Sequence, residues 1–399
     1  MDNLEVFDVV VVGGGPAGAT AATELARHGR SVLLLDRDGR IKPCGGAIPP
    51  RLIRDFRIPD QMLVARATSA RMIAPSDREV DMPVGNGFVG MVDRDMFDEW
   101  LRERAADAGA LRRIGTFEKI ERDGDGCAIV HYFEGRERDK ANPVQVRARS
   151  IIGADGARSA VARQSVKGAE KMKYVFAYHE IVRAPEAAAP GYDPQRCDVY
   201  YQGDKSPDFY SWIFPHGETM SIGTGSMQKG FSLRGSVSKL RKTTGLDKVE
   251  TIRREGAPIP LKPLKKWDNG RDVVLAGDAA GVVAPASGEG IYYAMTGGQL
   301  AAEAVDLMLR TGDARALATA RKRFMKDHGR VFLVLGIMQY FWYANDKRRE
   351  RFVKMCMDKD VQALTWDAYM NKKLVRAKPK EHVKIFLKDM AHLLGFAAT

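Results

Sequence analysis

Three glycines near the start of the chain have the spacing of a loop that binds the pyrophosphate of a dinucleotide. Gly13, Gly15 and Gly18 follow a run of valines, and Asp36 comes about twenty residues later. In such loops the first glycine permits a tight turn, the second lets the backbone approach the phosphates, and the third lets a helix pack on the strand. The helix amide groups would face the phosphates, and Asp36 would accept hydrogen bonds from ribose hydroxyls. The predicted contact residues are Gly13, Gly15, Pro16, Ala17, Gly18, Asp36 and Arg37.

The elements that must position this loop are also present in the sequence. The apolar run 7–12 predicts a buried strand, 19–28 predicts a helix, and 31–35 predicts a second strand that ends at the acid. This strand, loop, helix and strand order is the context in which the glycine pattern indicates a nucleotide site. The alternative, glycines that serve only a turn, leaves the acid and both strands unexplained.

Two other apolar strands end in motifs that pair Asp with Gly. The strand from 151 ends at Asp155-Gly156, and the strand from 273 ends at Gly277-Asp278. These runs resemble the second and third motifs of the FAD-dependent class that includes para-hydroxybenzoate hydroxylase. The resemblance implies bound FAD, with Asp155 and Gly156 near its pyrophosphate and Gly277 and Asp278 at its ribitol chain.

Arg94 begins a segment with helical periodicity, 95–108. In the same class an arginine at this position lies against the flavin, whereas the alternative is an exposed arginine at a helix start.

Gly288, Gly290 and Ile291 should begin another helix, directed at the flavin pyrimidine. The positive end of that helix would stabilise negative charge on reduced flavin, which favours hydride chemistry. The sequence contains no second glycine motif of this kind, so NADPH would bind at a shallower surface.

The run from Tyr210 to Pro215 carries aromatic residues at alternate positions. Alternation places Tyr210, Trp212 and Phe214 on one face of a strand, and a buried aromatic face in a sheet core is the alternative. The run resembles the YxWxFP motif of geranylgeranyl reductases, and flavin halogenases carry a related WxWxIP. The resemblance places Tyr210, Trp212, Phe214 and Pro215 at the substrate.

A turn that follows the second strand contains Cys44, Gly45 and Gly46. It resembles the Cys-Gly turn of the same reductases, which implies a place near flavin and substrate. Whether Cys44 acts chemically or only lines the pocket stays open, and no residue is identified as the proton donor.

The resemblance extends over essentially the whole chain. Near the C-terminus the segments 348–352, 360–362 and 386–394 are similar to the bacteriochlorophyll branch of the reductases. The chain is identified as a member of the geranylgeranyl reductases of (bacterio)chlorophyll biosynthesis. This implies FAD, NADPH and stepwise saturation of a geranylgeranyl chain to phytyl, on the free diphosphate or on the pigment. Tyr210 and Trp212 would stabilise positive charge on carbon through their ring faces.

Three rival functions remain at this point. An FAD monooxygenase or halogenase would consume oxygen with a small aromatic substrate. An archaeal-type geranylgeranyl lipid reductase would share the chemistry but not the C-terminal segments. A prenyl-chain carrier would keep FAD without turnover.

Composition limits the partners and the location. The net charge is +12 and the pI is about 9.4, which favours an anionic partner, but no nucleic-acid motif accompanies the charge. Four cysteines without a CxxC pair indicate neither a zinc site nor a disulfide framework. With no export signal at the N-terminus, we expect a cytoplasmic protein, with peripheral contact to the inner photosynthetic membrane as a further option. Oligomeric state is left open.

The C-terminal quarter should be helical. Segment 331–344 is too short to span a bilayer, and we expect it to pack in the core, with Lys347, Arg348, Arg349 and Arg351 on the surface. Segment 381–394 should form an amphipathic helix that docks on the core or on an anionic membrane.

The predicted fold class is α/β (α+β), with a Rossmann-type FAD-binding domain, an inserted antiparallel-sheet substrate domain and a helical C-terminal extension. The predicted domains are 1–72, 93–170 and 270–330 for FAD, 73–92 and 171–269 for the substrate sheet, and 331–399 for the helical region.

Overall fold

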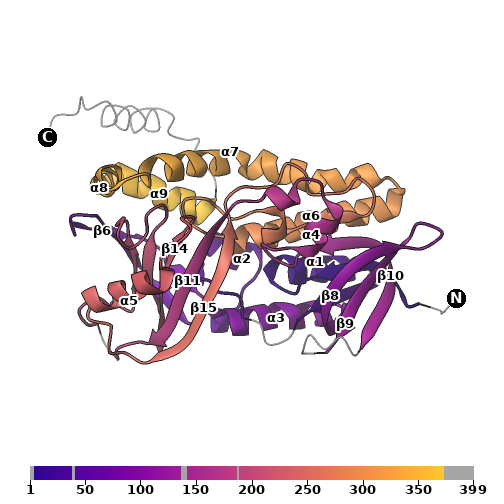
Figure 1. Ribbon diagram of the computed structural model, residues 1–399, viewed down its shortest axis with the longest axis horizontal. Helices are drawn as coiled ribbons and strands as arrows, with labels where there is room; N and C mark the ends of the chain where they lie inside the picture. The colour runs from indigo at the N-terminus through magenta and orange to yellow at the C-terminus, as the bar shows by residue number, and fades with distance from the viewer. Residues whose placement is uncertain (1–3, 38–40, 136–141, 187, 373–399) are drawn as a thin grey trace. The chain divides into compact units, whose positions relative to one another are not determined.

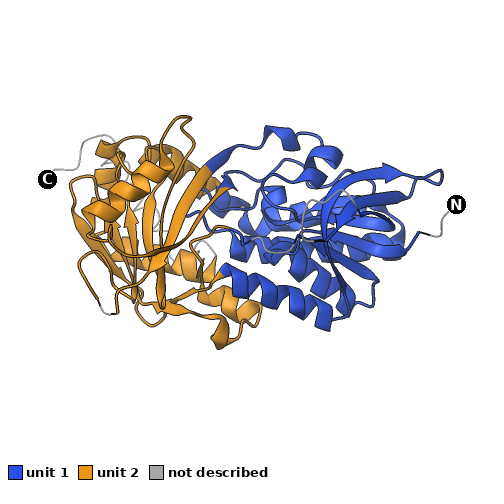
Figure 2. Ribbon diagram, turned by 60° about the horizontal axis from the view of Figure 1, so that its bottom comes forward, with its two compact units in different colours: residues 1–42, 94–175, 258–332 blue, residues 43–93, 176–257, 333–399 orange. Residues whose placement is uncertain are grey.

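The computed structural model describes residues 4–37, 41–135, 142–186 and 188–372. The chain forms two compact units (Figure 2). Unit 1 contains residues 1–42, 94–175 and 258–332, and unit 2 contains residues 43–93, 176–257 and 333–399. The predicted α/β class, with a nucleotide fold, a second sheet and a helical C-terminal region, is confirmed.

Unit 1 is built on a six-stranded sheet (Figure 1). Its strands are β1 (Val6–Val12), β2 (Val32–Asp36), β8 (Leu111–Arg122), β9 (Ala128–Glu134), β10 (Pro143–Gly153) and β16 (Val273–Leu275). The parallel part runs in the order β8, β2, β1, β10 and β16. The long strands β8 and β10 continue past this part and pair antiparallel with β9.

The strand ends of this sheet set the position of the three motifs. Val12 lies opposite Gly153, and Gly153 lies opposite Leu275. The glycine loop, the Asp155 turn and the Asp278 turn therefore leave the sheet at one edge, the carboxyl ends of parallel strands, where ligands bind in such folds.

The helices of unit 1 pack on the sheet and on one another. Helix α1 contacts both α3 and α6. The helical elements are α1 (Pro16–Arg27), α3 (Arg94–Asp107), α4 (Ala160–Ser165), η2 (Ala169–Lys171), η3 (Gly277–Ala280), α6 (Ile291–Thr311) and η4 (Ala314–Leu317).

The contact of α1 with α6 is close because it lacks a side chain on one partner. A methyl group at Gly298 of α6 would overlap the carbonyl oxygen of Ala17 and lie 2.9 Å from its carbonyl carbon. Gly277, which precedes α6 in the chain, would place a methyl group 2.7 Å from the Ala17 Cβ. Small residues at these positions bring the third motif against the first.

Unit 2 contains a seven-stranded sheet whose neighbouring pairs are antiparallel except for the parallel pair β5 and β12. In sheet order the strands are β15 (Thr251–Pro260), β11 (Tyr174–Arg183), β14 (Thr219–Ser226), β13 (Ser211–His216), β12 (Arg196–Tyr200), β5 (Ser69–Ile73) and β6 (Glu79–Pro83). A small sheet contains β3 (Ala47–Ile48), β7 (Val89–Met91) and β4 (Ala65–Ala67).

The two faces of the large sheet are covered differently. Helix α5 (Leu233–Thr243) packs Val237 and Leu240 against Ile213 and Ile222, which form one core. Residues of the other alternation, among them Phe214, belong to a second core with the small sheet. The remaining helical elements of the chain are α2 (Pro50–Asp55), η1 (Asp60–Met62), α7 (Ala318–Trp342), α8 (Asp346–Met355) and α9 (Lys359–Asn371).

The compact units divide the chain at other points than the predicted domains. Residues 43–72 group with unit 2 because strand β5 pairs with β6 and β12 of the large sheet. Helices α8 and α9 also group with unit 2, since α8 contacts β6 and α9 contacts α2. The predicted amphipathic helix 381–394 lies outside the described residues.

Two expectations for the segment after α6 were wrong. Leu333, Ile337 and Tyr340 of α7 are 64%, 59% and 85% exposed and do not lie in the core. Arg349 is fully buried, where it donates hydrogen bonds to the carbonyls of Pro207 and Tyr343. Among the described residues, no helix combines the length and the apolar character that crossing a bilayer requires.

The contact of α1 with α6 yields a prediction. Gly298→Ala should lower the free energy of unfolding by about 1–3 kcal/mol, because the new methyl group meets backbone atoms that cannot move aside. Gly297→Ala is the matched control, since its methyl group would lie 3.5 Å from the nearest atom and a helical alanine is favoured over glycine by about 1 kcal/mol. Thermal unfolding measures both, and equal melting temperatures would contradict the close contact.

Candidate active site

The glycine loop of unit 1 has the conformation that its spacing predicts. Gly13 has φ of +104°, and a methyl group there would lie 2.6–2.8 Å from backbone atoms of Ala154 and Asp155. Next to Gly15, by contrast, the described residues leave open space where a side chain would stand. Helix α1 begins at Pro16, and its first internal bond runs from the Ala19 N–H to the Gly15 carbonyl. The preceding amide groups are therefore available to a phosphate.

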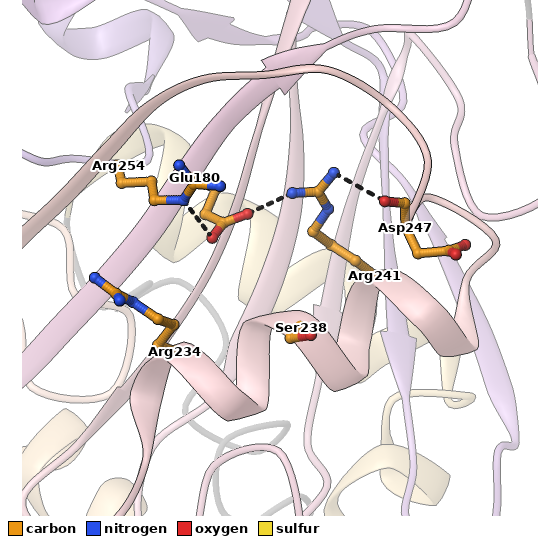
Figure 3. A pocket seen from close by; sticks show the side chains of 6 residues that line it. All are labelled: Glu180, Arg234, Ser238, Arg241, Asp247 and Arg254. Carbon is orange, nitrogen blue, oxygen red and sulfur yellow. Dashed lines mark hydrogen bonds and ion pairs between the residues drawn. The ribbon is translucent and has the colours of Figure 1, made fainter.

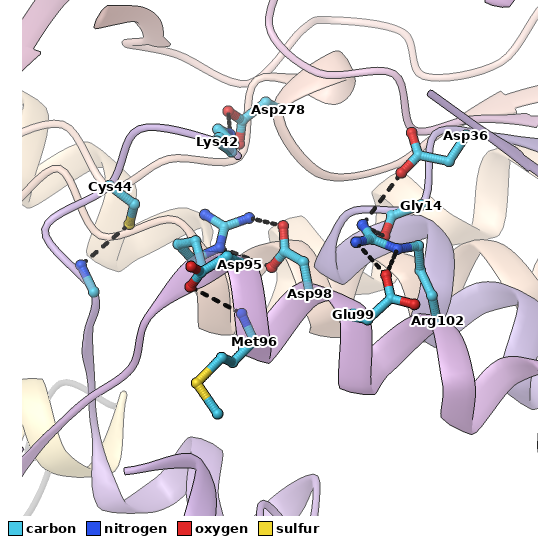
Figure 4. Close-up of polar contacts among 12 residues, drawn as sticks. Gly14, Asp36, Lys42, Cys44, Asp95, Met96, Asp98, Glu99, Arg102 and Asp278 are labelled. Carbon is cyan, nitrogen blue, oxygen red and sulfur yellow. Dashed lines mark hydrogen bonds and ion pairs between the residues drawn. The ribbon is translucent and has the colours of Figure 1, made fainter. Parts of the chain in front are cut away.

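Asp36 ends β2 at this loop. Its Oδ2 accepts a hydrogen bond from Arg102 Nη1 at 3.3 Å, and Arg102 also donates to the Gly14 carbonyl at 3.4 Å (Figure 4). Burial raises the pKa of Asp36, and the Gly14 N–H and Arg102 offset part of that effect. The carboxylate is thus a buried acceptor with capacity for ribose hydroxyls. Arg37 follows it directly in the chain.

Sequence reasoning missed Arg102. Its guanidinium also binds Glu99 at 2.7 Å, so one side chain fixes the acid and the loop together. Arg102 follows Arg94 by eight residues on α3, and that spacing returns to the same helix face. A second basic residue on the face already assigned to the cofactor was the available signal.

The aspartate of the second motif is used within the fold. Asp155 accepts hydrogen bonds from the backbone N–H of Ala160 at 2.6 Å and of Val161 at 3.3 Å, and from the Ser159 hydroxyl. It therefore caps α4 and holds the turn in which Gly156 has φ of +87°. A role at the pyrophosphate would fall to the backbone of this turn.

The third motif places a buried carboxylate beside a lysine. Asp278 lies on η3 with an exposed fraction of 8%, and its Oδ2 forms an ion pair with Lys42 Nζ (Figure 4). Gly277 and Gly281 have φ of +63° and +82°, conformations that favour glycine. Lys42 was not predicted, and no spacing relates it to Asp278.

Arg94 is buried at the start of α3, so the alternative of an exposed arginine is excluded. Its guanidinium binds both oxygens of Asp98, at 2.8 and 2.6 Å. This bidentate pair one turn along the helix fixes the direction of the arginine.

Helix α6 begins at Ile291, as the Gly288 and Gly290 pattern predicts. Gly288 has φ of +65°, and no side chain of the described residues caps the helix. Its first amide groups and the positive end of a 21-residue helix are directed at whatever lies before it.

The residues of unit 1 fit FAD. They provide open space beside Gly15, uncapped starts of α1 and α6, and buried carboxylates at Asp36 and Asp278 for hydroxyl groups. Which residues contact the cofactor remains as predicted from the sequence.

The aromatic strand lies in unit 2. Tyr210 and Trp212 are buried with ring centroids 5.9 Å apart, and Trp212 and Phe214 are 6.2 Å apart. The three rings thus follow one another on the face of β13 opposite α5, as alternation predicts, and Pro215 completes the strand.

A glycine on the neighbouring strand makes room for the central ring. Gly223 pairs with Trp212 on one side and with His179 on the other. A methyl group at Gly223 would overlap the indole and lie 2.7 Å from the His179 Cβ. The glycine therefore lets the two side chains meet above β14.

The cysteine turn lies against the same strand within unit 2. A methyl group at Gly45 would be 3.0 Å from the Phe214 ring, and the Gly46 N–H donates to Cys44 Sγ at 3.4 Å. His216 Nε2 bonds the Gly45 carbonyl at 3.1 Å, and Nδ1 bonds Asp93 at 2.7 Å. Both partners are acceptors, so both ring nitrogens must donate. His216 thereby holds the turn, a role that sequence reasoning missed.

The face of the sheet that carries α5 has a pocket of about 410 Å³ (Figure 3). Its arginines surround Glu180, which bonds Arg241 and lies 3.3 Å from Arg254. Burial raises the pKa of Glu180 and Arg241 lowers it, with a net decrease. Arg241 also donates to backbone carbonyls of the Leu246 to Val249 turn. The internal carboxylate balances much of the positive charge, so the pocket is a structural ion cluster.

Three comparisons with known proteins agree with this geometry. Residues 6–326 match the family model described as an FAD binding domain. The chain is 59% identical to the geranylgeranyl diphosphate reductase of Rhodobacter capsulatus over 98% of both chains, and 36% identical to that of Synechocystis over 98% of both. A solved structure titled as a geranylgeranyl bacteriochlorophyll reductase-like protein of Thermoplasma acidophilum has a TM-score of 0.80 at 23% identity, covering 94% of this chain and 99% of that one. The chain belongs to the geranylgeranyl diphosphate reductase family of FAD-dependent oxidoreductases.

Proposed function

We propose that the protein is an NADPH-dependent reductase that saturates double bonds of a geranylgeranyl chain and yields the phytyl tail. Membership in the family supports the substrate class. The observation that carries the proposal is the buried row of Tyr210, Trp212 and Phe214 beside the Cys44 turn. Such a row offers an apolar prenyl chain an aromatic surface without charged groups.

The chemistry requires one hydride and one proton for each double bond. Bound FAD, reduced by NADPH, supplies the hydride to one carbon of the alkene. The π electrons take up a proton at the other carbon, so the alkene is reduced and the cofactor is oxidised. An isolated alkene has no carbonyl to polarise it, so positive charge develops on carbon and must be stabilised by the pocket.

Trp212 and Tyr210 would provide that stabilisation. The face of an aromatic ring attracts a cation, most strongly for tryptophan, and the effect grows when water is excluded. The exposed fractions of Trp212 and Tyr210, 6% and 8%, meet this condition. In unit 1 the start of α6 would stabilise the negative charge of the reduced cofactor. Cys44 is proposed to line the substrate site, and Pro215 to end its strand.

A substitution at Trp212 tests the role of the row. Trp212→Leu should keep FAD bound but slow reoxidation of the NADPH-reduced protein by geranylgeranyl diphosphate about tenfold, measured anaerobically by stopped-flow absorbance. Trp267→Leu, a buried tryptophan of unit 1, is the control for loss of a large side chain. Reoxidation at the wild-type rate in Trp212→Leu would rule out this role.

We also propose peripheral contact with an anionic bilayer through the α7 stripe, defined as Leu333, Ile337 and Tyr340. These residues recur at helical spacing and are all more than half exposed. A very apolar substrate is most accessible from a membrane, and the net charge of +12 favours an anionic surface.

Replacement of the stripe tests this contact. Leu333→Glu with Ile337→Glu should abolish co-flotation with vesicles that contain anionic lipid, because both apolar burial and charge attraction are lost. Met96→Glu with Met357→Glu makes the same change at two other exposed apolar positions and should leave flotation intact. Equal flotation of both double variants would contradict a membrane role for the stripe.

A further inference from the structure

A line of buried hydrogen bonds leads from a carboxylate to the indole of Trp212. Trp212 Nε1 donates to Ser221 Oγ at 3.0 Å, and Ser221 Oγ lies 2.9 Å from His179 Nδ1. His179 Nε2 lies 3.0 Å from Glu255 Oε2. Ser221 is inaccessible to solvent and His179 is 3% exposed, so the line is shielded from water between its ends.

The register of three strands produces this line. His179 on β11, Gly223 on β14 and Trp212 on β13 are paired across the sheet, and Ser221 points to the same face two residues before Gly223. The absence of a side chain at Gly223 lets His179 and Trp212 converge on the Ser221 hydroxyl.

Counting donors and acceptors fixes the direction of the line. Glu255 is ionised: burial opposes its charge, but the bonds from His179 and Arg253 outweigh burial and lower its pKa. The carboxylate accepts, so His179 Nε2 donates. The indole N–H can only donate to Ser221. Among the described residues Ser221 has one other side-chain partner, His179 Nδ1, so the buried hydroxyl proton is satisfied when that nitrogen accepts it.

We infer that Glu255, His179 and Ser221 form a polarising relay that increases the electron density of the Trp212 ring. Every bond runs toward the carboxylate, and bonds aligned in this way reinforce one another in a low dielectric. Withdrawal of the indole proton toward Ser221 makes the ring face more negative and therefore a better partner for positive charge. The three residues act through Trp212 and are positioning residues.

This inference rests on the proposed function for its catalytic consequence but not for the relay itself. Within the proposed reaction, positive charge on carbon at Trp212 would be stabilised by a carboxylate that never contacts the substrate. The arrangement keeps full negative charge out of the apolar site, where it would cost desolvation energy and trap the cation.

The test separates the charge from the hydrogen bond. Glu255→Gln keeps an oxygen that can accept from His179 but removes the negative charge. Glu250→Gln is the matched control, because it makes the same charge change at an exposed carboxylate that pairs with Arg183. Ser221→Ala cuts the line beside Trp212, and Ser221→Thr retains the hydroxyl.

The first readout is the indole N–H resonance of Trp212 in the FAD-bound, 15N-tryptophan-labelled protein, assigned by its loss in Trp212→Leu. We expect the proton signal to move upfield in Ser221→Ala and in Glu255→Gln, and to stay in place in Ser221→Thr and Glu250→Gln. An unmoved signal in Glu255→Gln would overturn the relay, whatever the activity of the protein.

The second readout is the rate of prenyl reduction in a single turnover. We expect Glu255→Gln to slow it about three- to tenfold with FAD affinity and KM unchanged, and Glu250→Gln to leave it unchanged. A shifted resonance with an unaltered rate would overturn the catalytic consequence. If the wild-type protein reduces no prenyl substrate, the proposed function fails, while the resonance still decides the relay.

Discussion

The cofactor site depends on three segments that meet where side chains are missing. The backbone at Gly13 touches Ala154, and both Gly277 and Gly298 lie against Ala17. Residues more than 250 positions apart in the chain can come this close only because no Cβ stands between them. The parallel strands bring the segments to one sheet edge, and the glycines let them close on a shared space. The carboxylates of Asp36 and Asp278 gain their positions from this contact.

In unit 2 the same device serves a different purpose. Gly223 leaves a gap in the middle strand of three, and the gap is filled by Trp212 and His179 from its neighbours. One face of the sheet thus carries aromatic rings with a polar line beneath them, whereas the other face carries α5 and an apolar core. The sheet separates a structural function from a chemical one.

Patterns with a fixed period or spacing were predictable from the sequence. The glycine loop, the helix that starts at Ile291 and the single face shared by Tyr210, Trp212 and Phe214 are each determined within a short segment. The partnerships of Arg102 with Asp36, Lys42 with Asp278 and His216 with Asp93 are not, because they join residues that only the tertiary fold brings together. The burial of Arg349 was missed for the same reason, since its acceptors are backbone carbonyls of distant turns. The division into units also eluded composition, because β5 pairs with a strand more than a hundred residues away.

The account's central claim is that this flavoprotein reduces an alkene and does not insert oxygen. The direct test is the mass of the product formed from geranylgeranyl diphosphate, and separately from geranylgeranylated pigment, with NADPH in D2O without oxygen. The account predicts a saturated chain that carries one solvent deuteron for each double bond reduced, on at least one of the two substrates. A chain recovered unchanged from both, with an oxygenated product only when air is admitted, would contradict it.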